Sequence, residues 1–192
     1  MTAQVLPPLN AAELEQVARR DASEQLIVVD REDREIGPAG KLEVHVDGRL
    51  HRAFSILVFN ARGELLLQRR ADAKYHFANR WSNTCCGHPR PGETTVAGAG
   101  RRLKEEFGFR VPLTERNELI YRAEDQASGL IEHEYLHIYH GHFTDDPQPD
   151  PSEVGAWRWM SVAAIRRALR MHPEWFTPWF AILVDRLLPP ED

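Results

Sequence analysis

The stretch Gly87–Phe109, GHPRPGETTVAGAGRRLKEEFGF, has the most specific spacing of residues in the chain. Its first part is rich in Gly and Pro, as loops are, and its second part is rich in charged residues, as exposed helix surfaces are. We expect a helix from Thr94 to Phe107, with Thr94 or Thr95 as its N-terminal cap and Gly108 at its end. The stretch therefore predicts a loop that leads directly into a helix.

Two glycines lie inside this predicted helix, Gly98 and Gly100. Each would cost the helix roughly 1 kcal/mol relative to alanine. We expect this cost to be offset by close packing of the helix backbone against a sheet.

A glycine, an arginine and several acidic residues stand at fixed offsets in this stretch. The pattern consists of Gly87, Glu93, Arg101, Leu103, Glu105, Glu106 and Gly108. It resembles the Nudix pattern, in which a loop and helix collect hard divalent cations that hold a diphosphate. One position differs from the Nudix pattern, because this chain has Arg102 where the pattern has glutamate. The change removes a carboxylate and adds a guanidinium that can grip phosphate, which favours holding a diphosphate over cleaving it.

The remaining sequence predicts strands where apolar residues run together or alternate, and helices where they recur at helical spacing. The expected strands are 26–29, 50–60, 64–70 and 131–143, with the second and third forming a hairpin. The expected helices are 11–22, 94–107, 161–170 and 177–188, and turns or loops are expected at 30–40, 85–92 and 145–150. This order implies one layered α/β (α+β) domain, with a mixed β-sheet between helices as in the Nudix fold. We assign the domain to residues 24–190 and an N-terminal extension to residues 1–23.

Length and composition exclude several classes of protein. The 192 residues are 42% hydrophobic and 28% charged, too few for two full domains but enough to bury a core. The net charge of -5 gives no basic excess that would attract nucleic acid. No apolar stretch approaches the roughly 20 residues that span a membrane. The first residues, MTAQVLPPLN, show no signal core, so we expect a cytoplasmic protein. The sequence does not decide the oligomeric state, and we favour a monomer.

The chain has only two cysteines, Cys85 and Cys86, and they are adjacent. A disulfide between neighbours would be strained and would cross-link nothing distant. At least one free thiol therefore needs another explanation.

These cysteines belong to the segment WSNTCCGHP at residues 81–89. Further segments at separate places are Lys41, His45, LHRAFS at 50–55, YRA at 121–123, EHE at 132–134 and TPW at 177–179. Together they resemble the type I isopentenyl diphosphate isomerases, Nudix-fold enzymes of isoprenoid biosynthesis that interconvert isopentenyl and dimethylallyl diphosphate. The resemblance runs over residues 25–185 and is more specific than the Nudix pattern alone.

The resemblance implies a pair of groups that transfer protons. Moving a double bond requires one proton to reach an unactivated alkene and another to leave the neighbouring carbon, on opposite sides of a dry pocket. The implied pair is Cys86 and Glu134, and Tyr121 would support proton transfer at the glutamate. We expect Cys85 to be a small buried hydrophobic residue.

The resemblance also implies two cation sites and a set of substrate contacts. The first site would consist of His45, His51, His88, Glu132 and Glu134. Imidazoles combined with carboxylates suit zinc or manganese, and residues 132 and 134 share one face of the predicted strand. Magnesium would arrive with the diphosphate and lie near Glu106. The implied substrate contacts are Lys41, Arg70, Lys74 and Arg102 at the diphosphate, and Trp179 at the tertiary cation formed on protonation.

Alternative interpretations use other parts of the same sequence. The segment HEYLH at 133–137 matches the HExxH motif of zinc peptidases, which requires a helix. On the predicted strand its two histidines would be about 13 Å apart and could not share a zinc ion. A Nudix diphosphohydrolase acting on nucleoside diphosphate derivatives would share the fold, the magnesium and Glu105–Glu106, but would release phosphate. A module that only binds prenyl or nucleotide diphosphates would show no turnover. The histidines 76, 140, 142 and 172 match no metal position.

Overall fold

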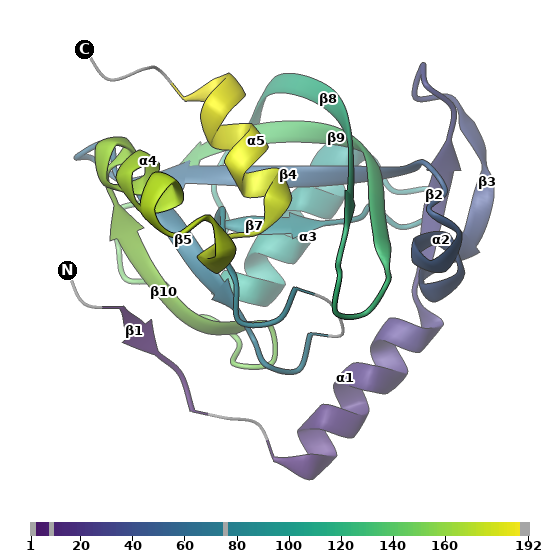
Figure 1. Cartoon of the computed structure of the whole chain (residues 1–192), viewed down its shortest axis with the longest axis horizontal. Coiled ribbons are helices and arrows are strands. Elements are labelled where there is room, and N and C mark those ends of the chain that lie inside the picture. Colours follow the sequence, from purple (N-terminus) through teal and green to yellow (C-terminus); the bar gives the residue numbers. More distant parts are fainter. Residues whose placement is uncertain (1–2, 8–9, 75–76, 189–192) are drawn as a thin grey trace.

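The computed structural model describes residues 3–7, 10–74 and 77–188, and its strands form one mixed sheet (Figure 1). The strands are β1 (Gln4–Val5), β2 (Gln25–Val29), β3 (Glu35–Gly40), β4 (His51–Phe59), β5 (Leu65–Arg70), β6 (Trp81–Ser82), β7 (Cys85–Gly87), β8 (Thr114–Glu124), β9 (Ile131–His142) and β10 (Val154–Met160). The helices are α1 (Ala11–Ser23), α2 (Lys41–Asp47), α3 (Thr95–Phe107), α4 (Val162–Met171) and α5 (Pro178–Leu187), with a 3-10 turn at Pro173–Trp175.

Strand β4 is the centre of the sheet. The main strand order is β1-β10-β5-β4-β2-β3, and β9 also pairs with β4, in parallel. The parallel register places His51 opposite Glu134 and continues to Phe59 opposite His142. Strand β8 runs antiparallel to β9 along nearly its whole length. This arrangement brings early and late parts of the chain together at one end of β4.

Helices cover both faces of the sheet, α4 and α5 on one and α3 on the other (Figure 1). On the α5 face, Leu57 packs with Phe180 in one apolar cluster. On the α3 face, Phe54 packs with Leu103 and Phe107 in a second cluster. The layered single domain expected from the sequence is confirmed.

The caps of α3 are those that the sequence predicts. The Thr94 hydroxyl accepts a hydrogen bond from the Ala97 N–H at 3.3 Å, and Gly108 has a φ of 78°. The Gly108 N–H donates to the Lys104 carbonyl at 3.0 Å and closes the last turn. Threonine at the start and a left-handed glycine at the end fix both ends of the helix.

The two glycines inside α3 differ. A methyl group on Gly98 would lie 3.0 Å from the backbone of Pro89 and 3.2 Å from the Phe54 ring, so close packing is confirmed there. A methyl group on Gly100 would meet nothing closer than 3.9 Å, at Arg110. The expectation of close packing is therefore wrong for Gly100, because that side of the helix faces open space.

Three other local expectations were incomplete. In the predicted hairpin, β4 and β5 pair only at Phe59 and Leu65. The rest of β4 pairs with other strands, β7 among them, and β5 pairs with β10 and β6. The start of the predicted loop 85–92 is strand β7, which pairs with β4. The end of the predicted turn region 30–40 is strand β3. It tolerates Pro38 because it is an edge strand, where a missing N–H breaks no central pairing.

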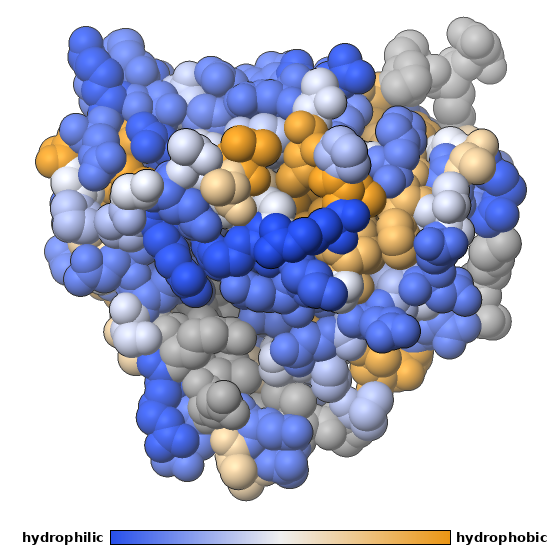
Figure 2. Space-filling model, turned by 180° about the vertical axis from the view of Figure 1, so that it is seen from behind, coloured by the Kyte–Doolittle hydropathy of each residue, from blue (hydrophilic) through white to orange (hydrophobic). Residues whose placement is uncertain are grey.

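The N-terminal extension contains β1, which pairs with β10, and α1, which agrees with the predicted helix 11–22. The domain boundary at residue 24 stays a prediction, and residues 189 and 190 lie outside the described part. Seen from behind, the surface is mostly hydrophilic with a limited apolar patch (Figure 2), which is ordinary for a protein surface. Among the described helices, none has the length and apolar character needed to cross a membrane.

Candidate active site

One cavity of about 600 Å³ gathers most of the predicted site residues. Those that line it are Lys41, Arg70, Lys74, Cys86, His88, Arg102, Tyr121, Glu132, Glu134 and Trp179. The other three each contact a lining residue, His45 and His51 through Glu132, and Glu106 through Arg102. The fold thus brings all predicted site residues to one place from α2, α3, α5, several strands and their loops.

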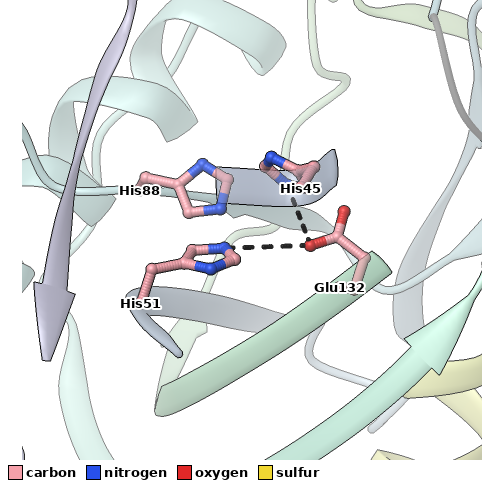
Figure 3. Close-up of side chains that lie close together, drawn as sticks. All are labelled: His45, His51, His88 and Glu132. Atoms are coloured by element: carbon pink, nitrogen blue, oxygen red, sulfur yellow. Dashed lines mark hydrogen bonds and ion pairs between the residues drawn. The ribbon is translucent and has the colours of Figure 1, made fainter. Parts of the chain in front are cut away.

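Three histidines and Glu132 form a buried cluster at one end of the cavity (Figure 3). The ring centres of His45 and His51 are 5.0 Å apart, and those of His51 and His88 are also 5.0 Å apart. One ligand atom from each of the four residues lies within 4.8 Å of the others. His45 Nε2 is 3.2 Å from Glu132 Oε2. Such a group could hold a single divalent metal ion.

Backbone carbonyls fix how two of these imidazoles are turned. Nδ1 of His45 is 2.7 Å from the Lys41 carbonyl, and Nδ1 of His51 is 2.9 Å from the Arg49 carbonyl. Because a carbonyl can only accept, each Nδ1 donates its hydrogen and Nε2 is the nitrogen turned to the cluster. Metal-binding histidines are oriented in this way by partners outside the metal site.

The charge states of His51 and His88 suit metal binding. Burial and the neighbouring His45 lower the pKa of His51 to about 4, and burial with both other imidazoles lowers the pKa of His88. The pKa of His45 is raised, because the Glu132 carboxylate outweighs the effect of burial. His51 Nε2 and His88 Nε2 are buried and make no hydrogen bond among the described residues. Neutral imidazoles with unused lone pairs are what a transition metal ion requires, so the donor set fits.

Glu134 lies between this cluster and Tyr121. Its Oε1 is 3.3 Å from His88 Nε2, and its Oε2 accepts a hydrogen bond from the Tyr121 hydroxyl at 2.7 Å. Burial and the nearby Glu132 charge raise the pKa of Glu134. Burial also raises the pKa of Tyr121, so its hydroxyl keeps the proton that it donates. The carboxyl group can therefore carry a proton at a pH where an exposed glutamate would be ionised.

The Cys86 thiol lines the same cavity from strand β7. Its Sγ is 3.2 Å from Asn83 Oδ1 and 3.3 Å from Ser55 Oγ. Burial raises the pKa of Cys86 to about 12, so the thiol is protonated at neutral pH. Cys85 is fully buried on the other face of the sheet, as expected for a small hydrophobic residue.

Arg102 and Lys74 lie at another part of the cavity wall, and carboxylates hold both. Arg102 Nη2 is 2.6 Å from Glu106 Oε1 and 3.0 Å from Glu153 Oε2, and Lys74 is paired with Glu153 as well. Burial disfavours the guanidinium charge, but Glu106 and Glu153 outweigh it and raise the pKa of Arg102. The carboxylates thus hold both cationic groups in place at the cavity wall.

Trp179 covers the cavity from α5. Its ring is nearly perpendicular to that of Phe77 at 5.2 Å, and the Arg70 guanidinium lies 5.5 Å from its centre. Its indole N–H donates to Ser82 Oγ at 2.9 Å. An aromatic face in this position can stabilise a cation in the cavity.

Three residues at this site were missed in the sequence. Glu153 stands in an unremarkable turn segment, and only the folded chain brings it to Arg102. Ser55 and Asn83 lie inside quoted motifs, but a short polar residue in a motif does not reveal which atom it contacts.

The zinc-peptidase interpretation is excluded by the structure of the segment HEYLH, whose histidines lie on the opposite face of β9. The segment 133–137 is strand, as predicted, and its histidines face other partners. His133 Nδ1 is 3.0 Å from the Gly48 carbonyl, whereas His137 lies between Glu115 at 2.6 Å and Asp33 at 3.1 Å. His76, which matched no metal position, lies outside the described residues.

Comparison with known proteins agrees with this architecture. A model of the NUDIX domain matches residues 49–180. Among solved structures, DR0079 from Deinococcus radiodurans superposes with a TM-score of 0.73 at 18% identity, covering 86% of this chain and all of that one. A MutT protein from Methanosarcina mazei gives a TM-score of 0.59 at 20% identity, covering 71% of this chain and 91% of that one. The class of protein that the fold and site define is therefore the Nudix class.

Closer relatives narrow the class further. An isopentenyl-diphosphate Delta-isomerase from Halorhodospira halophila is 51% identical over 84% of this chain and 94% of its own length. Another with the same name, from Burkholderia multivorans, is 48% identical over 85% of this chain and 92% of its own length. This chain belongs to the isopentenyl-diphosphate Delta-isomerase family.

Proposed function

We propose that this protein interconverts isopentenyl and dimethylallyl diphosphate, and that Cys86 and Glu134 transfer the two protons. The observation that carries the proposal is that a thiol and a carboxyl group line one cavity whose wall also carries Arg102 and Lys74. The reaction needs one group to give a proton to the alkene and another to take one from the adjacent carbon. The identity of the family, shown by its relatives, supports the same reaction.

The environments of the two groups support this role. Burial raises the pKa of Cys86 to about 12, so its thiol carries a proton near neutral pH. Burial and the nearby Glu132 charge raise the pKa of Glu134, which makes its carboxylate a better acceptor for a proton. Tyr121 keeps its own proton, and its hydrogen bond holds the Glu134 carboxyl group in place for proton transfer. The side chains around the two groups are largely buried, which limits water near the cation formed on protonation. Trp179 would present an aromatic surface to that cation.

We further propose that His45, His51, His88 and Glu132, with Glu134 beside them, hold a zinc or manganese ion. An ion there would supply positive charge next to Glu134 and favour its carboxylate form. Magnesium would accompany the diphosphate near Glu106. The diphosphate would be bound by Lys41, Arg70, Lys74 and Arg102.

The alternative is a Nudix diphosphohydrolase, and the products separate the two. We would incubate the metal-loaded protein with isopentenyl diphosphate and magnesium in D₂O, follow proton NMR, and assay phosphate in parallel. We expect deuterium-labelled dimethylallyl diphosphate without phosphate release, and loss of this product with Cys86→Ala. Phosphate release, or no conversion of the prenyl diphosphate, would contradict the proposal. The cytoplasmic location and the monomeric state stay predictions from the sequence.

A further inference from the structure

Asn83 is a fully buried residue beside the thiol, and its side-chain amide has only one acceptable orientation. Its Nδ2 donates to the Ile56 carbonyl at 3.1 Å and to the Cys85 carbonyl at 3.0 Å. Turning the amide over would bring its oxygen against both carbonyl oxygens. The Asn83 Oδ1 atom therefore faces the other way, toward Cys86 Sγ at 3.2 Å.

This orientation determines where the hydrogens near the sulfur lie. An amide oxygen can only accept, so the Cys86 S–H donates to Asn83. The Ser55 hydroxyl is 3.3 Å from the same sulfur, and Ser55 is also fully buried. Because the single thiol hydrogen is already used, the Ser55 hydroxyl must donate to the sulfur. Two buried groups thus hold Sγ from two directions.

The same amide oxygen connects the thiol to Trp179. Ser82 Oγ donates to Asn83 Oδ1 at 3.1 Å and accepts from the Trp179 indole N–H at 2.9 Å. Thr177 Oγ1, at 2.9 Å from Ser82 Oγ, must then donate, because the Ser82 hydrogen is already used. Strand β7, the segment before it and helix α5 are therefore tied together by one buried hydrogen-bonded chain.

We propose that Asn83 and Ser55 are positioning residues, which hold the Cys86 sulfur at the place where it exchanges a proton with the substrate. The proposal rests on the proposed isomerase function. A cysteine side chain can otherwise turn about its Cα–Cβ bond between staggered positions, which place the sulfur at different points relative to the cavity. A misplacement of about 1 Å can cost a reaction roughly a hundredfold in rate.

Neither residue is among the residues that line the cavity wall near Arg102 and Lys74. Removing either should therefore affect the proton transfer and leave binding of the diphosphate intact. A role in stability alone would lower the melting temperature without changing kcat of the folded enzyme. The division between kcat and KM distinguishes the two roles.

The chain offers a matched control next to Asn83. Thr84 is also fully buried, accepts from the Val58 N–H at 2.9 Å and donates to the Leu66 carbonyl at 2.7 Å. Thr84→Val keeps the shape of the side chain and removes these buried hydrogen bonds. No hydrogen bond joins Thr84 to the thiol in the described structure, so this variant reports the cost of lost buried bonds alone.

The experiment measures kcat, KM and melting temperature for the wild-type protein, Asn83→Ala, Ser55→Ala and Thr84→Val, all metal-loaded and below their melting temperatures. We expect Asn83→Ala to lose roughly 30-fold to 100-fold in kcat and Ser55→Ala roughly fivefold, with KM within about twofold. Thr84→Val should melt at lower temperature and keep kcat within about twofold. Ser55→Ala guards against misfolding of Asn83→Ala, because the sulfur is the one partner that we find for the Ser55 hydroxyl in the described structure.

Two results would overturn the proposal, and they are distinguishable. If the wild-type protein makes allylic product and both variants match Thr84→Val in kcat, the positioning role is wrong while the isomerase function stands. If the wild-type protein makes no allylic product, the isomerase function fails, and the positioning role fails with it.

Discussion

The two faces of strand β9 carry similar side chains, but in the described structure some histidine nitrogens near one face lack the hydrogen-bond partners that those of His137 on the other face have. On the cavity face, Glu132 and Glu134 lie near histidines whose Nε2 atoms, at His51 and His88, make no hydrogen bond in the described structure. On the opposite face, both nitrogens of His137 have carboxylate partners. A group of histidine and carboxylate side chains alone therefore does not mark a metal site. Buried lone pairs that have been left unused distinguish one face from the other, because leaving them unpaired costs stability unless a ligand uses them.

The largest difference between the faces should be in turnover. We expect Glu134→Gln to lower kcat by roughly a thousandfold, because a group that transfers a proton to or from carbon is lost. The matched change on the opposite face is Tyr135→Phe, which removes a hydroxyl that donates to Glu118 at 2.7 Å. Its kcat should stay within about twofold of wild type. Steady-state kinetics would measure kcat for both variants. An equal loss of kcat in the two would contradict the difference between the faces.

The next difference concerns bound metal. We expect His51→Gln to weaken zinc or manganese binding by more than the roughly 10-fold to 100-fold that losing even an outer partner of a ligand costs. His137→Gln should keep wild-type affinity and lower the melting temperature by a few degrees. Metal content after dialysis, measured by elemental analysis, gives the answer. Equal loss of metal from both variants would show that the opposite face also binds an ion.

A third test sharpens the comparison on the α3 face, where packing should govern stability. Gly98→Ala should destabilise the protein by about 1–3 kcal/mol, because a methyl group would press on Pro89 and Phe54. Gly100→Ala should stabilise it by up to about 1 kcal/mol, because the methyl group has room and alanine favours helix. Urea unfolding of the two variants gives the free energies. Similar changes of the same sign would contradict the difference in packing.

The smallest expected effect is a pH dependence on the same face. Arg101 donates to Glu93 at 2.9 and 2.8 Å, and these hydrogen bonds lower the pKa of Glu93 despite some burial. A lowered pKa means that the carboxylate stabilises the fold above its unfolded pKa, and that this contribution is lost as the pH falls through the folded value. Glu93→Gln should cost about 1 kcal/mol at neutral pH and progressively less in acid. Thermal melting over a pH series would show this, and a constant difference would contradict it.

Features with a local physical cause could be predicted from the sequence. Thr94 and Gly108 set the ends of α3 through their own backbone preferences, and the alternating residues of 131–143 required a strand. Helix α2 was missed because it is short and its N-cap, Gly40, has no side chain to signal a start. Strand β8 was missed because most of its residues are exposed and polar, which hides the alternation.

The site divides in the same way. The chemically specific residues could be placed by resemblance, because their types and spacing are distinctive. Glu153 and Asn83 could not, since their contacts depend on how separate segments meet in space. Glu153 becomes part of the site only because the fold brings Lys74 and Arg102 into contact with it.

The parallel pairing of β4 with β9 also bears on the order in which the protein assembles. His51 and Glu134 are register partners although about half of the domain separates them along the chain. Pairings between distant segments carry a large loop-closure entropy and slow the folding of a domain that depends on them. Because Glu132 belongs to β9, its cluster with the three histidines is complete only once this pairing has formed. We therefore expect a bound ion to slow unfolding more than it speeds folding.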